Sequence, residues 1–140
     1  MINGLQSVEA KKVIERFEFD KNLSFDAVFP FTYAVDLLEG NLIVSNFNSR
    51  LLKKVPHATH ATLQLIVVGL DFEHQSSFVQ NSSNKITISL QDATETDLEF
   101  SCLIPQSRVV FGLLHLEFFQ RVNAVDYDLQ AGALKIVGFR

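Results

Sequence analysis

The sequence predicts an all-β domain, a two-sheet antiparallel β-sandwich of the immunoglobulin or fibronectin type III kind with one short N-terminal helix. Short runs along the chain alternate apolar and polar residues with a period of two. Gly, Pro and Asn turn signals separate these runs at short intervals, as in sandwiches of about eight or nine strands. One long apolar run, from Val109 to Phe119, has no polar face at helical spacing, which is typical of a central strand.

No linker, repeat or low-complexity tract divides residues 1–140, so the chain is expected to form a single domain. A closed β-barrel is the alternative architecture. The helix is expected at residues 3–17, where Asn3 can cap it and apolar residues follow a spacing of i, i+3, i+4 and i+7. The residues of this stripe are Ala10, Val13, Ile14 and Phe17. The helix could equally be the end of an upstream segment.

Period-two patterns predict the strands in order. The predicted strands are 23–29, 32–38, 41–47, 61–73, 86–90, 98–104, 109–122, 125–129 and 133–139. Glu39-Gly40-Asn41 indicates a hairpin turn, and Ala131-Gly132 indicates a turn before the last strand. A β-bulge is expected near Gly69, because the apolar side of the strand changes there. Polar loops are expected at 48–57, 75–84 and 92–97, the second with a short edge strand at Phe78-Val79.

The segment from Ser107 to Leu129 is the predicted centre of the fold, a strand, a tight turn at Asn123-Ala124 and an amphipathic return strand. Three residues on one side of the first strand are predicted to lie in the core: Leu114, Leu116 and Phe118. The opposite side begins with Val109, Phe111 and Leu113 and then becomes polar. This second apolar side also needs a cover, which predicts an interface there.

Four phrases occur in one order along the chain. They are Phe17-Glu18-Phe19-Asp20, Pro56-His57-Ala58-Thr59-His60, Asp71-Phe72-Glu73, and Phe118-Phe119-Gln120-Arg121-Val122-Asn123-Ala124 with Tyr127 and Leu129. Over most of residues 15–140 the chain resembles the C-terminal domain of a family of uncharacterised hypothetical proteins from Bacteroidota. The resemblance implies an intact domain and a bacterial source but no known activity, and a basic upstream segment usual in that family is missing here. Ala124 stands where the pattern has Gly, which argues against a type I′ turn.

The composition of the chain bears on which classes of partner it could bind. The net charge of −4 and the scarcity of clustered Lys and Arg predict no nucleic-acid partner. The one basic cluster, Arg50, Lys53 and Lys54, is interpreted as a solvated loop. No apolar run is long enough to span a bilayer and no signal peptide is visible, so we expect no membrane insertion and, by default, a cytoplasmic location. The single cysteine, Cys102, is interpreted as a small core residue.

The best metal-ligand types occur at two places in the sequence. They are His57 and His60 with Asp71, Glu73 and His74. A transition metal needs three or four converging donors, and on one straight strand His57 and His60 would face opposite ways. We therefore expect no metal site and no cofactor, and keep His57, His60 and His74 as the candidates for a metal.

His115 and Glu117 share one face of the central strand, and Arg121 follows on the same face. This row is the candidate polar site, since it could form a pocket or a general acid–base pair. The alternative interpretation is the solvated, ion-paired half of a strand. Asp126 and Asp128 form a carboxylate row on the return strand, for which a solvent-facing role is expected.

These patterns predict a non-catalytic structural or protein-interaction module that binds a protein partner or itself, within a larger assembly of a phage-like or surface kind. The chain has no phosphate-binding glycine loop, nucleophile elbow or cysteine pair, so no enzyme activity is expected. A glycan- or ligand-binding module is the first alternative, although the chain has no Trp and only two Tyr. A metal-dependent enzyme is the second alternative.

Overall fold

The computed structural model describes residues 25–52, 55–71, 77–93, 95–107 and 109–139. The helix predicted at 3–17 lies outside these residues. The described elements are α2 (Phe25–Val28), β1 (Tyr33–Asp36), β2 (Asn41–Asn48), the 3-10 helix η1 (Ser49–Leu51), β3 (His60–Asp71), β4 (Ser77–Ser89), β5 (Glu95–Ser101), β6 (Val109–Val122) and β7 (Val125–Phe139).

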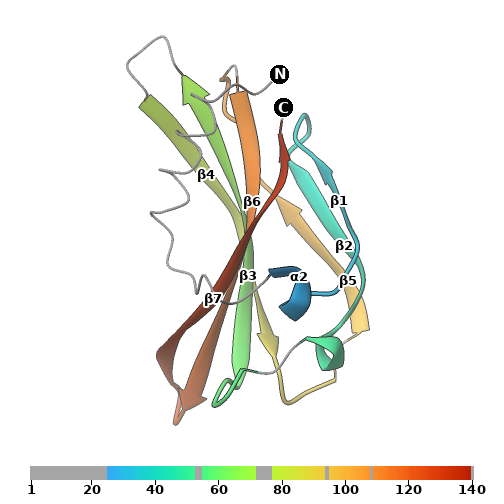
Figure 1. Ribbon diagram of the computed structural model, residues 1–140, viewed down its shortest axis with the longest axis vertical. Coiled ribbons are helices and arrows are strands. Elements are labelled where there is room, and N and C mark those ends of the chain that lie inside the picture. Colours follow the sequence, from blue (N-terminus) through green and yellow to red (C-terminus); the bar gives the residue numbers. More distant parts are fainter. Residues whose placement is uncertain (1–24, 53–54, 72–76, 94, 108, 140) are drawn as a thin grey trace.

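The described strands form two antiparallel sheets that pack face to face (Figure 1). One sheet has three strands in the order β1-β2-β5, and the other has four in the order β4-β3-β6-β7. The prediction of an all-β sandwich is therefore confirmed. The alternative of a closed barrel is wrong, because each of the two described sheets has two open edges.

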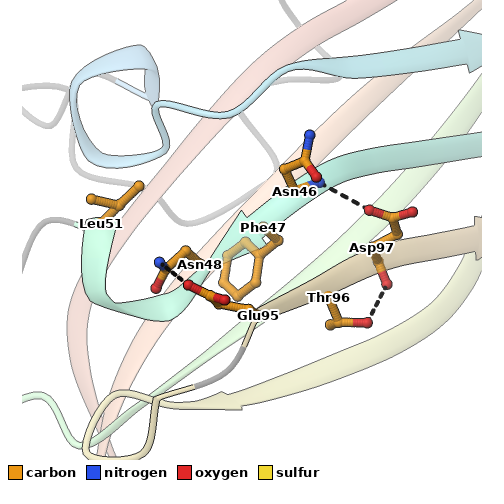
Figure 2. A pocket seen from close by; sticks show the side chains of 7 residues that line it. All are labelled: Asn46, Phe47, Asn48, Leu51, Glu95, Thr96 and Asp97. Carbon is orange, nitrogen blue, oxygen red and sulfur yellow. Dashed lines mark hydrogen bonds between the residues drawn. The ribbon is translucent and has the colours of Figure 1, made fainter.

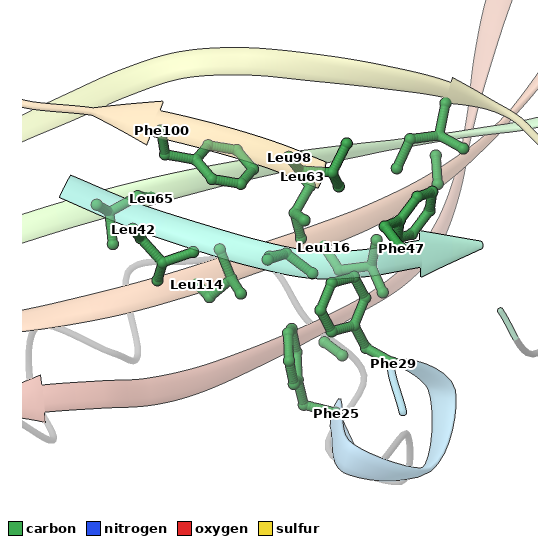
Figure 3. Close-up of a cluster of buried hydrophobic side chains, with 14 of the residues drawn as sticks. Phe25, Phe29, Leu42, Phe47, Leu63, Leu65, Leu98, Phe100, Leu114 and Leu116 are labelled. Carbon is green, nitrogen blue, oxygen red and sulfur yellow. The ribbon is translucent and has the colours of Figure 1, made fainter. Parts of the chain in front are cut away.

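The core lies between the two sheets and contains the predicted central residues (Figure 3). Leu114, Leu116 and Phe118 of β6 have no exposed surface. Phe100 of β5 and Leu42 of β2 meet them from the other sheet. Burying a Leu or Phe side chain contributes roughly 1.5–3 kcal/mol by transfer from water, so this layer is the main source of stability.

The strand predicted over residues 23–29 is wrong, because Phe25–Val28 form the helical turn α2. Phe25, Val28 and Phe29 follow the helical spacing i, i+3, i+4, and all three are buried in the sandwich core. Phe25 and Phe29 also fit a period of two, so the sequence pattern was ambiguous. The helix packs beside β7, where Lys135 Nζ binds Asp26 Oδ1 at 2.6 Å.

The β1–β2 hairpin is confirmed, and Gly40 in its turn has φ +81°. A Cβ atom at Gly40 would lie 2.0 Å from the carbonyl oxygen of Cys102, so this position requires glycine. The loop predicted at 48–57 begins with η1, whose first turn Asn48 caps by accepting a hydrogen bond from the amide of Arg50.

The bulge predicted at Gly69 is wrong, since β3 pairs with β6 without a shift of register. Gly69 instead makes room for Ser107, whose Oγ would lie 2.3 Å from an added Cβ. The apolar set of β3 changes sides because its second half is buried on both faces. The bulge lies on β4, where Ser83 and Asn84 stand opposite Leu65 between two shifted pairs.

The bulge on β4 is held by side chains. Ser83 Oγ accepts a hydrogen bond from the amide of Leu65 at 3.0 Å, which replaces a ladder hydrogen bond. Asn84 reaches the neighbouring sheet, where its Nδ2 donates to the Glu99 carbonyl oxygen and its Oδ1 accepts from the Ser101 amide, both at 3.1 Å. Asn84 therefore joins the edge of β5 to β4.

Three predicted boundaries are wrong. The polar loop at 75–84 is part of β4 from Ser77 onward, because an edge strand with a solvated side tolerates polar residues. β5 begins at Glu95 and ends at Ser101, earlier at both ends than the predicted 98–104. β7 continues through Ala131-Gly132, and a register shift against β6 between Phe118 and Phe119 absorbs the extra residues without a turn.

Candidate functional site

The four-stranded sheet has an outer face, which points away from the three-stranded sheet and is divided into two halves. The apolar half contains residues of the second hydrophobic cluster, with Ile66, Val68, Leu70, Phe111 and Leu113 buried. The polar half lies toward the β6–β7 turn, where the register pairs Thr62 with Glu117 and Arg121 with Asp126. The candidate polar site lies in this second half.

The β6–β7 turn sets the geometry of the polar half. Val122 pairs with Val125, so Asn123 and Ala124 are the two turn residues, with φ 50° and 66°. Positive φ at both residues is the signature of a type I′ turn, and the expectation against it is wrong. Because the loop has two residues, Arg121 stands directly opposite Asp126 on the outer face.

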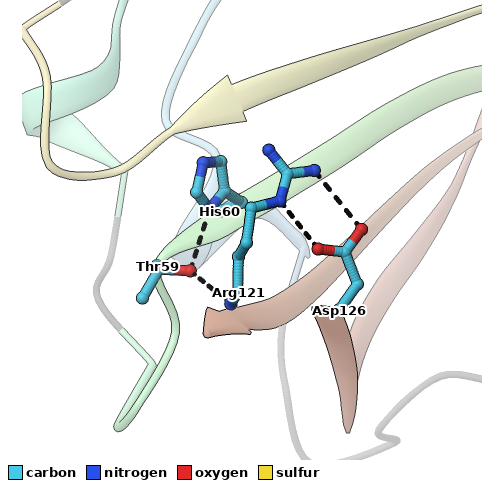
Figure 4. Close-up of polar contacts among 4 residues, drawn as sticks. All are labelled: Thr59, His60, Arg121 and Asp126. Carbon is cyan, nitrogen blue, oxygen red and sulfur yellow. Dashed lines mark hydrogen bonds and ion pairs between the residues drawn. The ribbon is translucent and has the colours of Figure 1, made fainter. Parts of the chain in front are cut away.

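Arg121 and Asp126 form a bidentate ion pair (Figure 4). Arg121 Nε donates to Asp126 Oδ1 at 2.7 Å, and Nη2 donates to Oδ2 at 3.3 Å. The hydrogen bond from Arg121 lowers the pKa of the Asp126 carboxyl, and the same hydrogen bond raises the pKa of Arg121. Each charge is therefore offset by the other.

Phe119 lies between two ring contacts in the polar half. The His60 ring stacks on it with centroids 5.3 Å apart and planes at 14°, and Arg121 Cζ lies 5.4 Å from its centroid. Thr59 connects the strands, since its Oγ1 accepts a hydrogen bond from the Arg121 amide and contacts His60 Nδ1, both at 2.8 Å (Figure 4). These contacts hold the side chains of the polar half in place from both β3 and β6.

His115 and Glu117 share the outer face with Arg121, as the alternation predicts. His115 Nε2 lies 3.8 Å from Glu117 Oε1, which is longer than a hydrogen bond. Below them an open groove of about 380 Å³ runs between β4 and β7. Its lining is Thr62, Lys85, Thr87, Glu117, Phe118, Phe119, Arg121, Asp126 and Asp128. A functional role for His115, Glu117 and Arg121 stays a prediction.

The metal candidates are only partly described. His57 lies exposed in a turn with φ 69°, whereas His60 begins β3 and stacks on Phe119. His74 and Glu73 lie outside the described residues, and of Asp71 only the strand position is described. Within the part of the chain that the structure describes, no three His, Cys, Asp or Glu side chains are grouped to hold a metal ion.

A second groove, of about 410 Å³, lies between β2 and β5 (Figure 2). A bulge on β2 places Asn46 at φ 54°, and its amide donates to Asp97 Oδ1 at 2.9 Å. Asn48 Nδ2 donates to Glu95 Oε1 at 2.9 Å. The alternation along β2 gives no sign of this groove, because the groove depends on one Asn at the position where the register shifts. The polar groups of this groove could bind a hydroxylated ligand. Phe47, its aromatic lining residue, is fully buried and offers no exposed ring for a sugar to stack on.

The other side of the β6–β7 hairpin end is apolar and exposed. We call Val122, Val125 and Tyr127 the tip patch; their exposed fractions are 42%, 50% and 52%. The register pairs Val122 with Val125 and Gln120 with Tyr127, so the patch continues the core side of the hairpin. The sequence predicts an amphipathic return strand, and these side chains lie on the apolar side of the hairpin. They are exposed because they extend beyond the part of the hairpin that the three-stranded sheet covers (Figure 1).

Cys102 follows β5 and is partly buried against the core cluster, in agreement with its interpretation as a small core residue. Its Sγ–H donates to the Leu103 carbonyl oxygen at 3.4 Å. Burial raises the pKa of the Cys102 thiol, and a thiol kept protonated is a poor nucleophile.

No family model, curated protein or solved structure matches this chain. The resemblance to the family from Bacteroidota therefore stays a prediction. Among the described residues, no helix has both the length and the apolar character needed to cross a membrane.

Proposed function

We propose that this domain is a non-catalytic protein-interaction module that associates with a second copy of itself through the tip patch. The observation that carries the proposal is the exposure of three large apolar side chains on one side of a hairpin end. Exposed apolar side chains that lie together mark interaction surfaces more often than scattered ones do.

A second copy is the favoured partner because the tip patch is complementary to itself. The cross-strand pairs on that side, Val122 with Val125 and Gln120 with Tyr127, contain no charged residue. Arg121 and Asp126, which neighbour Val122 and Val125 along the chain, lie on the opposite side, where their charges offset each other. A two-fold axis through such a patch would bring apolar surface against the same apolar surface without like-charge repulsion.

The size of the tip patch determines how stable the proposed dimer is expected to be. Full burial of one such side chain contributes roughly 1.5–3 kcal/mol, and each of these side chains is already about half buried. Burying the remaining half of all six side chains in a dimer would therefore contribute about 4.5–9 kcal/mol. Association itself costs about 4–15 kcal/mol. We therefore expect a weak dimer that forms only at high protein concentration, unless a tether or a neighbouring module raises the local concentration.

The polar half of the outer face supports the non-catalytic part of the proposal. Arg121, the one guanidinium of the candidate row, is engaged by Asp126 in a bidentate pair. His115 and Glu117 are too far apart for a direct hydrogen bond, and the groove beside them is open to solvent. A water-exposed groove of this kind gives little electrostatic stabilisation to a transition state.

Sedimentation equilibrium over a wide concentration range tests the proposal. The wild-type chain should show a reversible monomer–dimer equilibrium, Val125→Lys should be monomeric, and Leu103→Lys should behave as wild type. Leu103 is the matched control, because it is apolar and 82% exposed but lies beside Asn81 of β4, which is level with Gly112 and not with the hairpin end. A wild-type chain that stays monomeric at the highest concentration would overturn the proposal.

Cross-linking locates the contact. In a Cys102→Ser background, Tyr127→Cys should form an intermolecular disulfide faster than Asp128→Cys, because the two neighbouring residues lie on opposite sides of β7. Equal rates would place the contact elsewhere and contradict the role of the tip patch.

A further inference from the structure

The outer edge of β5 directs backbone hydrogen-bonding groups away from its own sheet. β5 ends the strand order β1-β2-β5, and within the described part of the chain β2 is the strand that pairs with it. The Cys102 amide, just after β5, donates to the Gly40 carbonyl oxygen on the β2 side at 2.9 Å. Because peptide groups alternate in direction along a strand, Leu98 also bonds toward β2, whereas Asp97 and Glu99 direct their peptide groups outward.

The side chain of Asn84 shows what this edge recognises. Its Nδ2 donates to the Glu99 carbonyl oxygen and its Oδ1 accepts from the Ser101 amide, both at 3.1 Å. A carboxamide carries the same kinds of donor and acceptor as a peptide unit, and a paired strand would bond to the same two groups. Asn84 covers one end of the edge. Among the described residues, the Asp97 and Glu99 amides have no such partner.

The side chains of β5 determine what kind of strand would fit. Leu98 and Phe100 are buried in the core. Glu95, Asp97 and Glu99 alternate with them, so these three β5 carboxylates lie in a row on the side away from the core. No Lys, Arg or His occurs in β1, β2 or β5. An added strand places its side chains directly opposite those of β5, where opposite charges stabilise the pair, so the row favours Lys or Arg at alternate positions.

A second copy of β5 is a poor partner for this edge. Pairing two antiparallel copies about any residue from Glu95 to Glu99 brings a carboxylate opposite a carboxylate. Like charges directly opposite each other destabilise a strand pair. The strand that fits therefore belongs to another protein, and the edge is a surface distinct from the tip patch.

We propose that the outer edge of β5 binds an extended segment of another protein in which Lys or Arg alternates with apolar residues. The backbone of the segment bonds to the Asp97 and Glu99 peptide groups, and its basic side chains lie beside the β5 carboxylates. Its apolar side chains lie on the core side, next to Leu98. Strand addition of this kind obtains affinity from main-chain hydrogen bonds and specificity from alternate side chains.

The proposal is tested with the full chain and a short, capped synthetic peptide that alternates lysine with valine. Binding should slow amide hydrogen exchange several-fold at Asp97 and Glu99 but not at Leu98, whose amide already bonds toward β2. A peptide of the same composition, with its lysines and valines in separate blocks, is the control. Equal binding of the two peptides, or protection away from β5, would overturn the proposal.

Backbone methylation separates strand addition from charge attraction. In an antiparallel added strand, the residues opposite Asp97 and Glu99 are the ones whose amides bond to β5, and these residues are the lysines. N-methylation of the lysines should therefore abolish binding, whereas N-methylation of the valines should preserve it. Binding that tolerates methylation at both sets of residues would show charge attraction alone and would overturn the proposal.

Charge reversal locates the site. Glu99→Lys should weaken binding of the lysine–valine peptide by roughly fivefold to tenfold, because it replaces an attractive cross-strand pair by a repulsive one. The same variant should gain binding of a glutamate–valine peptide. Glu39→Lys is the matched control, since it makes the same change of charge in the β1–β2 turn, where only the backbone amide of Glu39 is bonded to Asp36. Equal losses in the two variants would mean that net charge attracts the peptide, and would overturn the proposal.

Discussion

Arg121 and Asp126 face each other directly across a two-residue turn, with two guanidinium nitrogens hydrogen-bonded to two carboxylate oxygens. The pair holds the outer side of the β6–β7 hairpin end while the tip patch lies on the other side. The ion pair therefore adds a contribution that responds to pH and salt to the hairpin end that carries the tip patch.

The first prediction concerns pH. Because the Asp126 pKa is lowered in the folded chain, the pair is fully formed above the ordinary carboxyl pKa of about 4 and is lost as pH falls through the lowered value. An NMR titration of the Asp126 carboxyl and the Arg121 Nε–H should show both changes together. Asp126→Asn should remove the transition of the Arg121 signal. A carboxyl that titrates at its ordinary pKa would contradict the bidentate pair.

The second prediction concerns the two sides of β6. Phe118→Ala should lower the free energy of unfolding by about 3–5 kcal/mol, since the side chain is fully buried in the core. Glu117→Ala should cost about 0.5 kcal/mol, because its side chain is 41% exposed on the outer face. Denaturant unfolding of both variants decides the matter. Comparable losses would mean that Glu117 has a structural or functional partner.

The third prediction concerns the turn. Ala124 has φ 66°, where a Cβ costs about 1–2 kcal/mol, so Ala124→Gly should stabilise the domain by about 0.5–1 kcal/mol after the entropic cost of glycine. Ala34→Gly is the control, since Ala34 is exposed in β1. There glycine should destabilise the domain by about 0.5–1 kcal/mol. A destabilising Ala124→Gly would argue against the positive φ.

The fourth prediction concerns the bulge on β4. Ser83→Ala removes the acceptor of the Leu65 amide and should cost about 1–3 kcal/mol, because Ser83 is only 8% exposed. Ser82→Ala, next to it and exposed, should have almost no effect. If thermal unfolding shows equal changes in the two variants, the serine hydroxyl does not hold the bulge.

The sequence predicts the centre of this fold well, because β6 lies between two other strands and is buried where its pattern is apolar. The alternation in the β6 sequence matches the two faces of the strand in the structure, and Leu114, Leu116 and Phe118 lie in the core as expected. The errors lie where one pattern fits two structures. Phe25 and Phe29 satisfy both a strand and a helix, and Gly132 suits both a turn and the interior of a bulged strand.

The candidate site was predictable only in part. A two-residue turn at Asn123-Ala124 already implies that Arg121 opposes Asp126, so that pair could have been derived from the sequence. The exposure of Val122 and Tyr127 could not, because it depends on where the opposite sheet ends. The groove beside Asn46 depends on a register shift between β2 and β5, which alternation within one strand does not reveal.

Asn84 gives the sandwich a different kind of protection. Without Asn84, the outer edge of β5 would present unpaired amides and carbonyls to the strands of other molecules. Exposed edges of this kind promote aggregation by strand addition. Asn84 occupies the Glu99 carbonyl and the Ser101 amide with its own donor and acceptor, as a paired strand would. With these two groups occupied by one side chain, this part of the β5 edge is a poorer template for strand addition by another molecule.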